Sequence, residues 1–177
     1  MPTYQQAEAS GLSKPQVTLL AEGIAKRLDF GPGDDIHHLV KRLGGKVEVE
    51  DTLTEDPSRS GSLFVESPTS FRIVVPTHTS QLRDRFTIAH ELGHFFLHEM
   101  WRRQNGSRID GPMMALRRGS ERIEWEANWF AAGFLMPSEA FRESFNRNGG
   151  SIPAIAREFE VSGSAAEVRA RQLNLTH

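Results

Sequence analysis

Residues 85–100 read RFTIAHELGHFFLHEM, and this stretch carries the strongest structural signal in the chain. It places three of the chain's seven histidines, His90, His94 and His98, at intervals of four. Residues four apart on a helix lie on one face, about one turn from each other. The apolar residues between the histidines would bury the opposite side of the same helix. The stretch therefore predicts a helix with a histidine face.

On such a helix His90 and His94 can point ring nitrogens at a single ion. Glu91 is rotated by about 100° from His90 and lies beside the ion rather than on it. This is the HExxH arrangement of two zinc ligands and a carboxylate that acts as general base toward water. His98 lies roughly 12 Å along the helix axis from His90, too far to bind the same ion. We expect His98 to be a supporting or structural histidine.

The third ligand must come from another segment, and Glu121, Glu124 and Glu126 of the expected helix at 121–136 are the candidates. On a helical wheel Glu124 shares a face with Asn128, whereas Glu126 lies some 160° away from Glu124. We therefore favour Glu124 as the third ligand and expect Glu126 to face solvent. Asn128 would hold one of the ligand histidines in place through its amide.

The rest of the chain predicts an α+β fold. Apolar periodicity indicates helices over 14–30, 36–43, 81–99, 121–136, 139–146 and, in two pieces, 151–175. Short strands are expected over 46–50, 62–66 and 71–76, at a spacing typical of hairpins. They predict a small, mostly antiparallel three-stranded sheet packed on a helical core. Residues 101–120 are expected to form a long loop, and Gly93 indicates that another element approaches its helix closely.

Composition narrows the classes of protein. The formal net charge of −2 and the sequence pI of about 6.4 do not indicate a nucleic-acid binder. The absence of cysteine excludes disulfides and thiolate metal sites. The N-terminus shows no signal-peptide pattern, and the longest nearly apolar run, residues 129–137, is shorter than the roughly 20 residues of a membrane span. We expect a cytoplasmic protein with no membrane partner.

The two segments together resemble a known family. RFTIAHELGHFFLH at 85–98, followed by EWEANWFAAGFLMP at 124–137, is similar to the ImmA/IrrE zinc metallopeptidases. Their pattern is an R-F-x-x-A-H-E-x-G-H helix and then an E-x-x-A-N-x-F-A helix that ends in L-x-P. The resemblance implies Zn²⁺ as cofactor, a gluzincin-like ligand set at His90, His94 and Glu124, and Glu91 as general base. Asn128 lies beside the site in this pattern.

The resemblance also implies a domain organisation. Residues 14–147 would form the zinc metallopeptidase domain. The polar and small residues at 1–13 are expected, from their composition, to form a flexible tail before it. Residues 148–177 are similar to the small helix-turn-helix-like unit that follows the peptidase core in the family. The helical zinc-peptidase core, the sheet and this C-terminal helical appendage make up the expected fold.

Two classes of function follow. Members of the family cleave or inactivate helix-turn-helix repressors, so the resemblance implies a zinc-dependent endopeptidase whose protein substrate is a transcriptional repressor in stress-response or mobile-element regulation. Strand 71–76 could then hold the substrate by strand addition. The alternative is a DNA-binding or protein-binding regulator with a structural or vestigial zinc site. Residues 142–177 hold five arginines against four glutamates, so DNA binding is not favoured.

One part of the chemistry stays open. Peptide hydrolysis needs a group that stabilises the developing oxyanion. Tyr4, His78 and the arginines of residues 102–118 are the candidates that the sequence offers.

Overall fold

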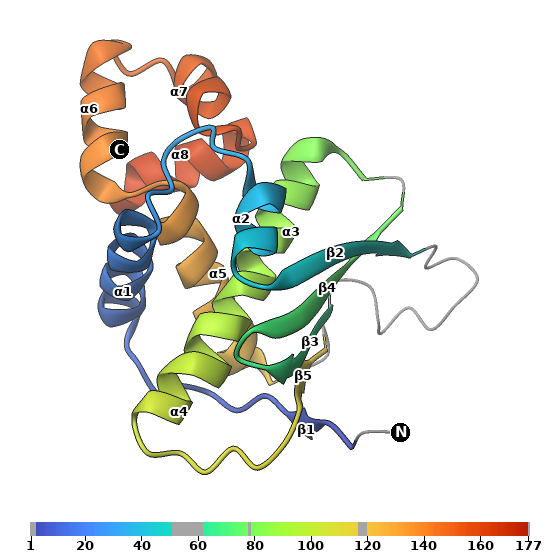
Figure 1. Ribbon diagram of the computed structural model, residues 1–177. Coiled ribbons are helices and arrows are strands. Elements are labelled where there is room, and N and C mark those ends of the chain that lie inside the picture. Colours follow the sequence, from blue (N-terminus) through green and yellow to red (C-terminus); the bar gives the residue numbers. More distant parts are fainter. Residues whose placement is uncertain (1–2, 51–61, 78, 117–119, 177) are drawn as a thin grey trace.

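The computed structural model describes residues 3–50, 62–77, 79–116 and 120–176 and has an α+β fold (Figure 1). Its helical segments are α1 (Lys14–Arg27), α2 (Ile36–Arg42), α3 (Gln81–His94), the π-helical segment η2 (Phe95–Trp101), α4 (Arg102–Gln104), α5 (Glu121–Leu135), α6 (Ser138–Arg147), α7 (Ile152–Phe159) and α8 (Gly163–Gln172). The strands are β1 (Gln5–Gln6), β2 (Gly45–Glu50), β3 (Ser62–Ser67), β4 (Ser70–Pro76) and β5 (Met113–Ala115). Of the helices described, none has both the length and the apolar character needed to cross a membrane.

The strands of the described residues form one mixed sheet of five strands in the order β1-β5-β3-β4-β2. Strand β3 pairs antiparallel with β4 and with β5, whereas β2 is parallel to β4 and β1 is parallel to β5. The expected three-stranded, mostly antiparallel sheet is therefore wrong in detail, although the β3–β4 hairpin is present. Strands β1 and β5 have only two and three residues, too few to show an alternating pattern. Strand β5 lies inside the stretch that was expected to be a loop.

Helix α3 lies between the sheet and α5, and α1 packs on the other side of α5 (Figure 1). The sheet-facing and α5-facing residues of α3 are fully buried, as Ile88 and Leu92 show. Helix α5 is buried on both of its sides, with Phe130 and Phe134 in the core. Two central helices packed in this way hold their backbones in fixed positions, which any site shared by α3 and α5 requires.

The N-terminal segment makes contacts that a loose tail would not make. Strand β1 pairs with β5, and the backbone N–H of Gln5 donates to Pro112 O at 2.8 Å. The N–H of Ala7 donates to Met114 O, also at 2.8 Å, and the Ala7 side chain belongs to the core. The segment thus lies on the edge of the sheet. The sequence pattern did not predict strand β1, because two residues are too few to show an alternation of apolar and polar side chains.

The C-terminal helices share the hydrophobic core of the rest of the chain. Phe141 of α6 packs against Phe159 of α7 with ring centroids 5.5 Å apart, and both are fully buried. Arg169 of α8 donates to Met136 O at 2.9 Å and pairs with Glu22 of α1 at 2.9 Å. The division into a domain at 14–147 and an appendage at 148–177 stays a prediction.

Candidate metal centre

Helices α3 and α5 are fixed against each other where the site lies. Ser80 caps α3 by accepting a hydrogen bond from Arg83 N, and Ser120 caps α5 by accepting one from Ile123 N. A Cβ built on Gly93 would lie 3.0 Å from both Cα and O of Ala127, so the two backbones touch at this point. The close approach expected at Gly93 is confirmed, and it brings the histidine face of α3 against the first turns of α5.

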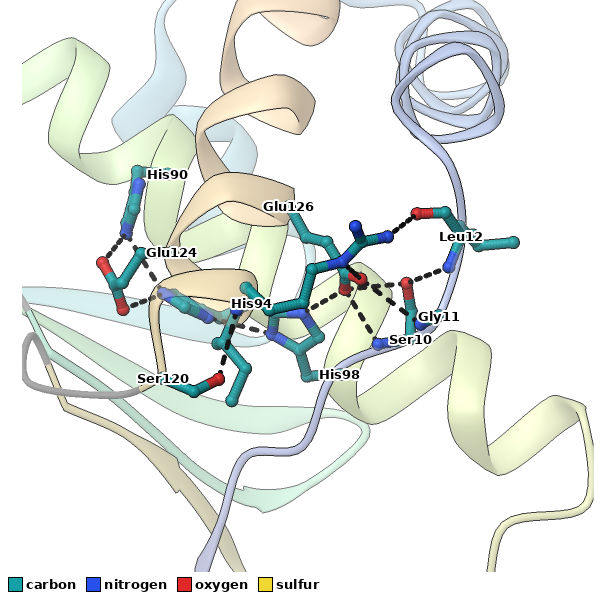
Figure 2. Close-up of polar contacts among 11 residues, drawn as sticks. Ser10, Gly11, Leu12, His90, His94, His98, Ser120, Glu124 and Glu126 are labelled. Carbon is teal, nitrogen blue, oxygen red and sulfur yellow. Dashed lines mark hydrogen bonds and ion pairs between the residues drawn. The ribbon is translucent and has the colours of Figure 1, made fainter.

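Three side chains converge from these helices (Figure 2). The Nε2 atoms of His90 and His94 lie 3.1 Å apart. Glu124 of α5 places Oε2 3.2 Å from His90 Nε2 and Oε1 3.5 Å from His94 Nε2. One ligand atom from each of the three residues lies within 4.8 Å of the others, and this group is the one set of potential metal ligands among the described residues.

The spacing of these donor atoms fits zinc. With zinc–nitrogen and zinc–oxygen bonds of about 2.0–2.1 Å, two ligands of a tetrahedral site lie about 3.4 Å apart. The separations of 3.1, 3.2 and 3.5 Å fall around this value. Two imidazoles and one carboxylate also form a typical donor set of catalytic zinc sites, which leave a fourth position open. The residues therefore fit a zinc ion, and the ligand assignment stays a prediction.

Asn128 fixes the orientation of His90. Its carbonyl oxygen Oδ1 lies 2.9 Å from His90 Nδ1. Because a carbonyl oxygen can only accept a hydrogen bond, the Nδ1 atom carries the hydrogen. In the neutral ring the lone pair is then on Nε2, the atom that faces His94 and Glu124. Asn128 occupies the place predicted for it, one turn after Glu124 on α5.

Glu91 lies beside the cluster and is buried, with 2% of its surface exposed. Its charge contributes to raising the pKa of His90, which places the two side chains within electrostatic reach. Burial alone would lower the pKa of His90, but the hydrogen bond with Glu124 and the nearby carboxylates outweigh it. This places a buried carboxylate within electrostatic reach of His90, and its role as general base stays a prediction.

The pKa values of the other two ligands also favour a bound cation. Burial lowers the pKa of His94 to about 3, so its ring is neutral at neutral pH and can offer a lone pair. Burial would raise the pKa of Glu124, but its contacts with the His90 and His94 rings lower it to about 2. Glu124 is therefore a carboxylate anion, and its side chain is partly buried, with 22% of its surface exposed. A cation between the three groups would satisfy all of them.

Glu126 is where the prediction from the helical wheel fails. It does not face solvent: none of its surface is exposed, and its Oε2 atom lies 3.0 Å from His98 Nε2. The angle of 160° from Glu124 was correct for an α-helix, but the opposite side of α5 is covered by the N-terminal segment. Ser10 donates to Glu126 Oε2 from both its backbone N and its hydroxyl at 2.8 Å. The i, i+4 pair of Arg122 and Glu126 was the one sequence signal that could have suggested a paired, buried carboxylate.

His98 lies against His94, with the two Nδ1 atoms 2.9 Å apart, and none of its surface is exposed. Of the candidates for oxyanion stabilisation, Tyr4 packs edge-on against Phe64 with ring centroids 5.5 Å apart. His78 lies outside the described residues. The structure therefore brings together His90, Glu91, His94, Glu124 and Asn128, with His98 behind them.

Comparisons with known proteins concern the family and the fold of the chain. The family model Peptidase_M78, described as the IrrE N-terminal-like domain, matches residues 41–171. No curated protein matches the sequence. Among solved structures, a Mycobacterium tuberculosis transcriptional regulator has a similar fold, with a TM-score of 0.58 at 18% sequence identity. The similarity covers 85% of this chain but 44% of the regulator, so the chain spans less than half the length of that protein.

Proposed function

Because the chain belongs to the peptidase family of the IrrE N-terminal-like domain, we propose that it is a zinc-dependent endopeptidase. The observation that carries this proposal is the convergence of His90, His94 and Glu124 within 4.8 Å, with the buried carboxylate of Glu91 beside them. Two packed helices hold these groups in place without a substrate. Such preorganisation is what a hydrolytic site needs.

Each residue has a distinct role in this proposal. His90, His94 and Glu124 hold the zinc, and Asn128 keeps the His90 ring in the tautomer that binds metal. When bound, the zinc supplies Lewis-acid polarisation of water and of the scissile carbonyl. Glu91 accepts the proton of the attacking water on its carboxylate and then donates it to the leaving amine. Its burial keeps bulk water away from this proton.

The substrate cannot be held at β4 by strand addition, as the sequence had suggested. Strand β4 pairs with β3 on one side and with β2 on the other, so its backbone groups are already used. Substrate addition needs an edge strand, and β2 is an edge of this sheet. The hairpin-like spacing of the strands had indicated antiparallel neighbours, whereas β2 pairs in parallel with β4.

A groove next to the metal centre offers a second place for the substrate. It has a volume of about 690 Å³ and is lined by residues of α1, α3, α5 and α8, with Asn128 in its wall. Its lining is mainly apolar, as Phe86, Trp129 and Val168 show, and includes Lys14 and Arg83 but no acidic residue. We propose that it holds an apolar segment of the protein substrate that carries acidic residues. The continuity with Asn128, and through it with His90, supports this choice.

The groove and the edge strand make different predictions. Val168 is 44% exposed in the groove, and Val49 is 64% exposed on β2. If the groove holds the substrate, Val168→Asp will raise the KM for protein cleavage severalfold without a loss of zinc, and Val49→Asp will not. The opposite result would place the substrate on β2.

A helix-turn-helix repressor is the substrate class that the family resemblance supports. The test incubates the zinc-loaded chain with the helix-turn-helix repressor encoded nearest to its own gene and maps cleavage by mass spectrometry. Cleavage by the wild-type chain, and its loss in Glu91→Gln with zinc retained, is the expected result. Binding of the repressor with no cleavage by the zinc-loaded wild-type chain would contradict the peptidase and support a regulator.

The regulator alternative draws on the similarity in fold to the Mycobacterium tuberculosis protein, which is a transcriptional regulator. The C-terminal helices of this chain lend it little support. Arg169 is 4% exposed and is bound inside the protein by Glu22 and Met136 O. Arg147 pairs with Glu158. Retention on DNA at about 0.15 M salt, compared with cleavage of the repressor, separates the two functions.

A further inference from the structure

A row of buried polar groups extends from the metal centre to the N-terminal segment (Figure 2). His94 Nδ1 lies 2.9 Å from His98 Nδ1, and His98 Nε2 lies 3.0 Å from Glu126 Oε2. The three residues are 1%, 0% and 0% exposed. The proposed peptidase chemistry uses His94 as a ligand but gives His98 and Glu126 no part.

The far end of the row determines the direction of its hydrogen bonds. Glu126 accepts from Ser10 N, Ser10 Oγ and Arg122 Nε at 2.8, 2.8 and 2.9 Å. Arg122 also donates to Leu12 O, and Gly11 N donates to Glu126 Oε1. These donors stabilise the charged carboxylate. As a carboxylate, Glu126 can only accept, so His98 Nε2 must carry a hydrogen.

The position of the hydrogen on His98 in turn determines which ring nitrogen of His94 carries a hydrogen. A neutral His98 with hydrogen on Nε2 has its lone pair on Nδ1. His94 Nδ1 must then be the donor of the 2.9 Å contact. The lone pair of His94 consequently lies on Nε2, the atom that faces His90 and Glu124. Ligand histidines usually donate their other N–H to a carboxylate or carbonyl, and here a second histidine relays that contact.

A purely structural role does not explain the row. Burying a histidine and a carboxylate costs free energy that paired apolar side chains would not cost. Neighbouring positions on η2 and α5 are filled by apolar residues such as Leu97 and Phe130, both fully buried. The segment around His98 is π-helical, a geometry that is frequent at functional sites.

We propose that His98 and Glu126 are positioning residues of the metal centre, and that residues 10–12 complete it by anchoring Glu126. Glu126 orients His98, and His98 orients the ring of His94. Residues 10–12 are thereby linked to His94, although they lie far from it in the sequence. This inference rests on the proposed metal centre but not on peptidase activity.

The test compares two buried carboxylates. Glu126→Gln keeps the shape of the side chain and removes the charge that orients His98. Glu99→Gln is the matched control, because Glu99 is 1% exposed, lies next to His98 in the sequence and pairs with Arg103 as Glu126 pairs with Arg122. Zinc affinity is measured by competition with a chelating dye. The visible spectrum of the Co²⁺-substituted protein reports the ligand geometry, and thermal unfolding without metal reports folding.

We expect Glu126→Gln to weaken zinc binding by about 10–100-fold and to shift the Co²⁺ bands, whereas Glu99→Gln changes neither. His98→Phe should have the same effect as Glu126→Gln. Ser10→Ala removes one hydrogen bond to Glu126 and the one that the Ser10 hydroxyl accepts from Leu12 N. It should lower zinc affinity severalfold with little effect on folding, so it serves if the other variants misfold.

Three results would overturn the proposal. Wild-type zinc affinity and Co²⁺ spectrum in Glu126→Gln and His98→Phe would show that the row does not position His94. An equal loss in Glu99→Gln would show that the effect is one of general stability. A wild-type chain that binds neither zinc nor Co²⁺ would overturn the metal centre itself, and this proposal with it.

Discussion

Gly93 of α3 lies directly against Ala127 of α5, because a Cβ at position 93 would lie 3.0 Å from the Cα and O atoms of Ala127 and 3.1 Å from Cβ of Phe130. Two of these neighbours are backbone atoms that cannot rotate away. Alanine favours a helix over glycine by about 1 kcal/mol, but overpacking of this kind costs about 1–3 kcal/mol. We expect Gly93→Ala to lower the free energy of unfolding and to weaken zinc binding, because α3 and α5 must move apart.

Gly23 of α1 is the matched control for this prediction. It also lies in a helix, but a Cβ there would meet no atom within 4 Å. Gly23→Ala should raise the free energy of unfolding by up to about 1 kcal/mol. Urea unfolding of both variants measures the difference. A Gly93→Ala protein as stable and as zinc-avid as the wild type would show that the close packing does not matter for the site.

The metal content is a direct test of the ligand set. We expect about one equivalent of zinc per chain by elemental analysis, as a single three-ligand site implies. His94→Ala should remove most of it, because His94 Nε2 lies within 3.5 Å of donor atoms on both other ligands. His38→Ala, at an exposed position of α2, should keep the full zinc content. Full retention in His94→Ala would exclude this site.

Glu124 and Asn128 should differ in how much they contribute to zinc binding. Glu124→Gln removes the charged ligand and should weaken binding far more than Glu126→Gln, which acts only through His98. Asn128→Ala removes the acceptor 2.9 Å from His90 Nδ1 and should cost about 10–100-fold in affinity. Dye competition gives all three affinities on one scale. A greater loss in Glu126→Gln than in Glu124→Gln would mean that the ligand assignment is wrong.

Local periodicity was sufficient to place most of this site on helices. His90, Glu91 and His94 are set by their spacing on one helix, and Glu124 and Asn128 by the wheel of another. The close packing that brings the two helices together was indicated only by Gly93, which predicted a close neighbour but not which element it would be. What packs against each face of α5 depends on the whole fold, and for this reason the sequence pattern placed Glu126 in solvent.

The pairing of the strands in the sheet likewise could not be predicted in full from local sequence patterns. The hairpin of β3 and β4 could be expected from two adjacent short strands. The parallel pairing of β2 with β4 and of β1 with β5 joins segments that are not neighbours in the chain. Strand β1 has no side-chain pattern over its two residues. Its position follows from the free edge of β5, which no local property of residues 5–6 reveals.

The corner between α6 and α7 gives a prediction about pH. Glu158 accepts from Ser144 Oγ at 2.6 Å and from Arg147 Nη2 at 2.5 Å. The hydrogen bond from Ser144, with those from Arg147 and Asn148, lowers the pKa of Glu158 below its usual value of 4.5. A lowered pKa stabilises the folded state above the unfolded-state pKa, and this contribution is lost as the pH falls through the folded-state value.

Glu158→Gln should therefore lower the free energy of unfolding by about 1 kcal/mol at pH 7, with a smaller difference from the wild type as the pH falls below about 4.5. Glu143→Gln, at an exposed position of α6, controls for the change in net charge. Urea unfolding at several pH values, at a fixed zinc concentration, measures both. A Glu158→Gln deficit that stays the same from pH 7 to pH 3 would contradict the charge-based explanation.

A substitution at Glu91 distinguishes an enzyme from a regulator in which zinc only stabilises the fold. The carboxylate is buried beside His90 but is not one of the three converging ligands. Glu91→Gln keeps its shape and removes the base. We expect this variant to fold, to keep its zinc and to bind the repressor, yet to cleave it at least about 100-fold more slowly, the low end of what a positioned acid–base group contributes. Cleavage rates, with the zinc content of both proteins measured in parallel, provide the comparison.

A structural zinc site makes the opposite prediction. Only changes at His90, His94 or Glu124 would then matter, because they would impair folding, and Glu91→Gln would have no effect. If the zinc-loaded variant cleaves at the wild-type rate, Glu91 is not the base, and proton transfer must be assigned to another group near the ligands.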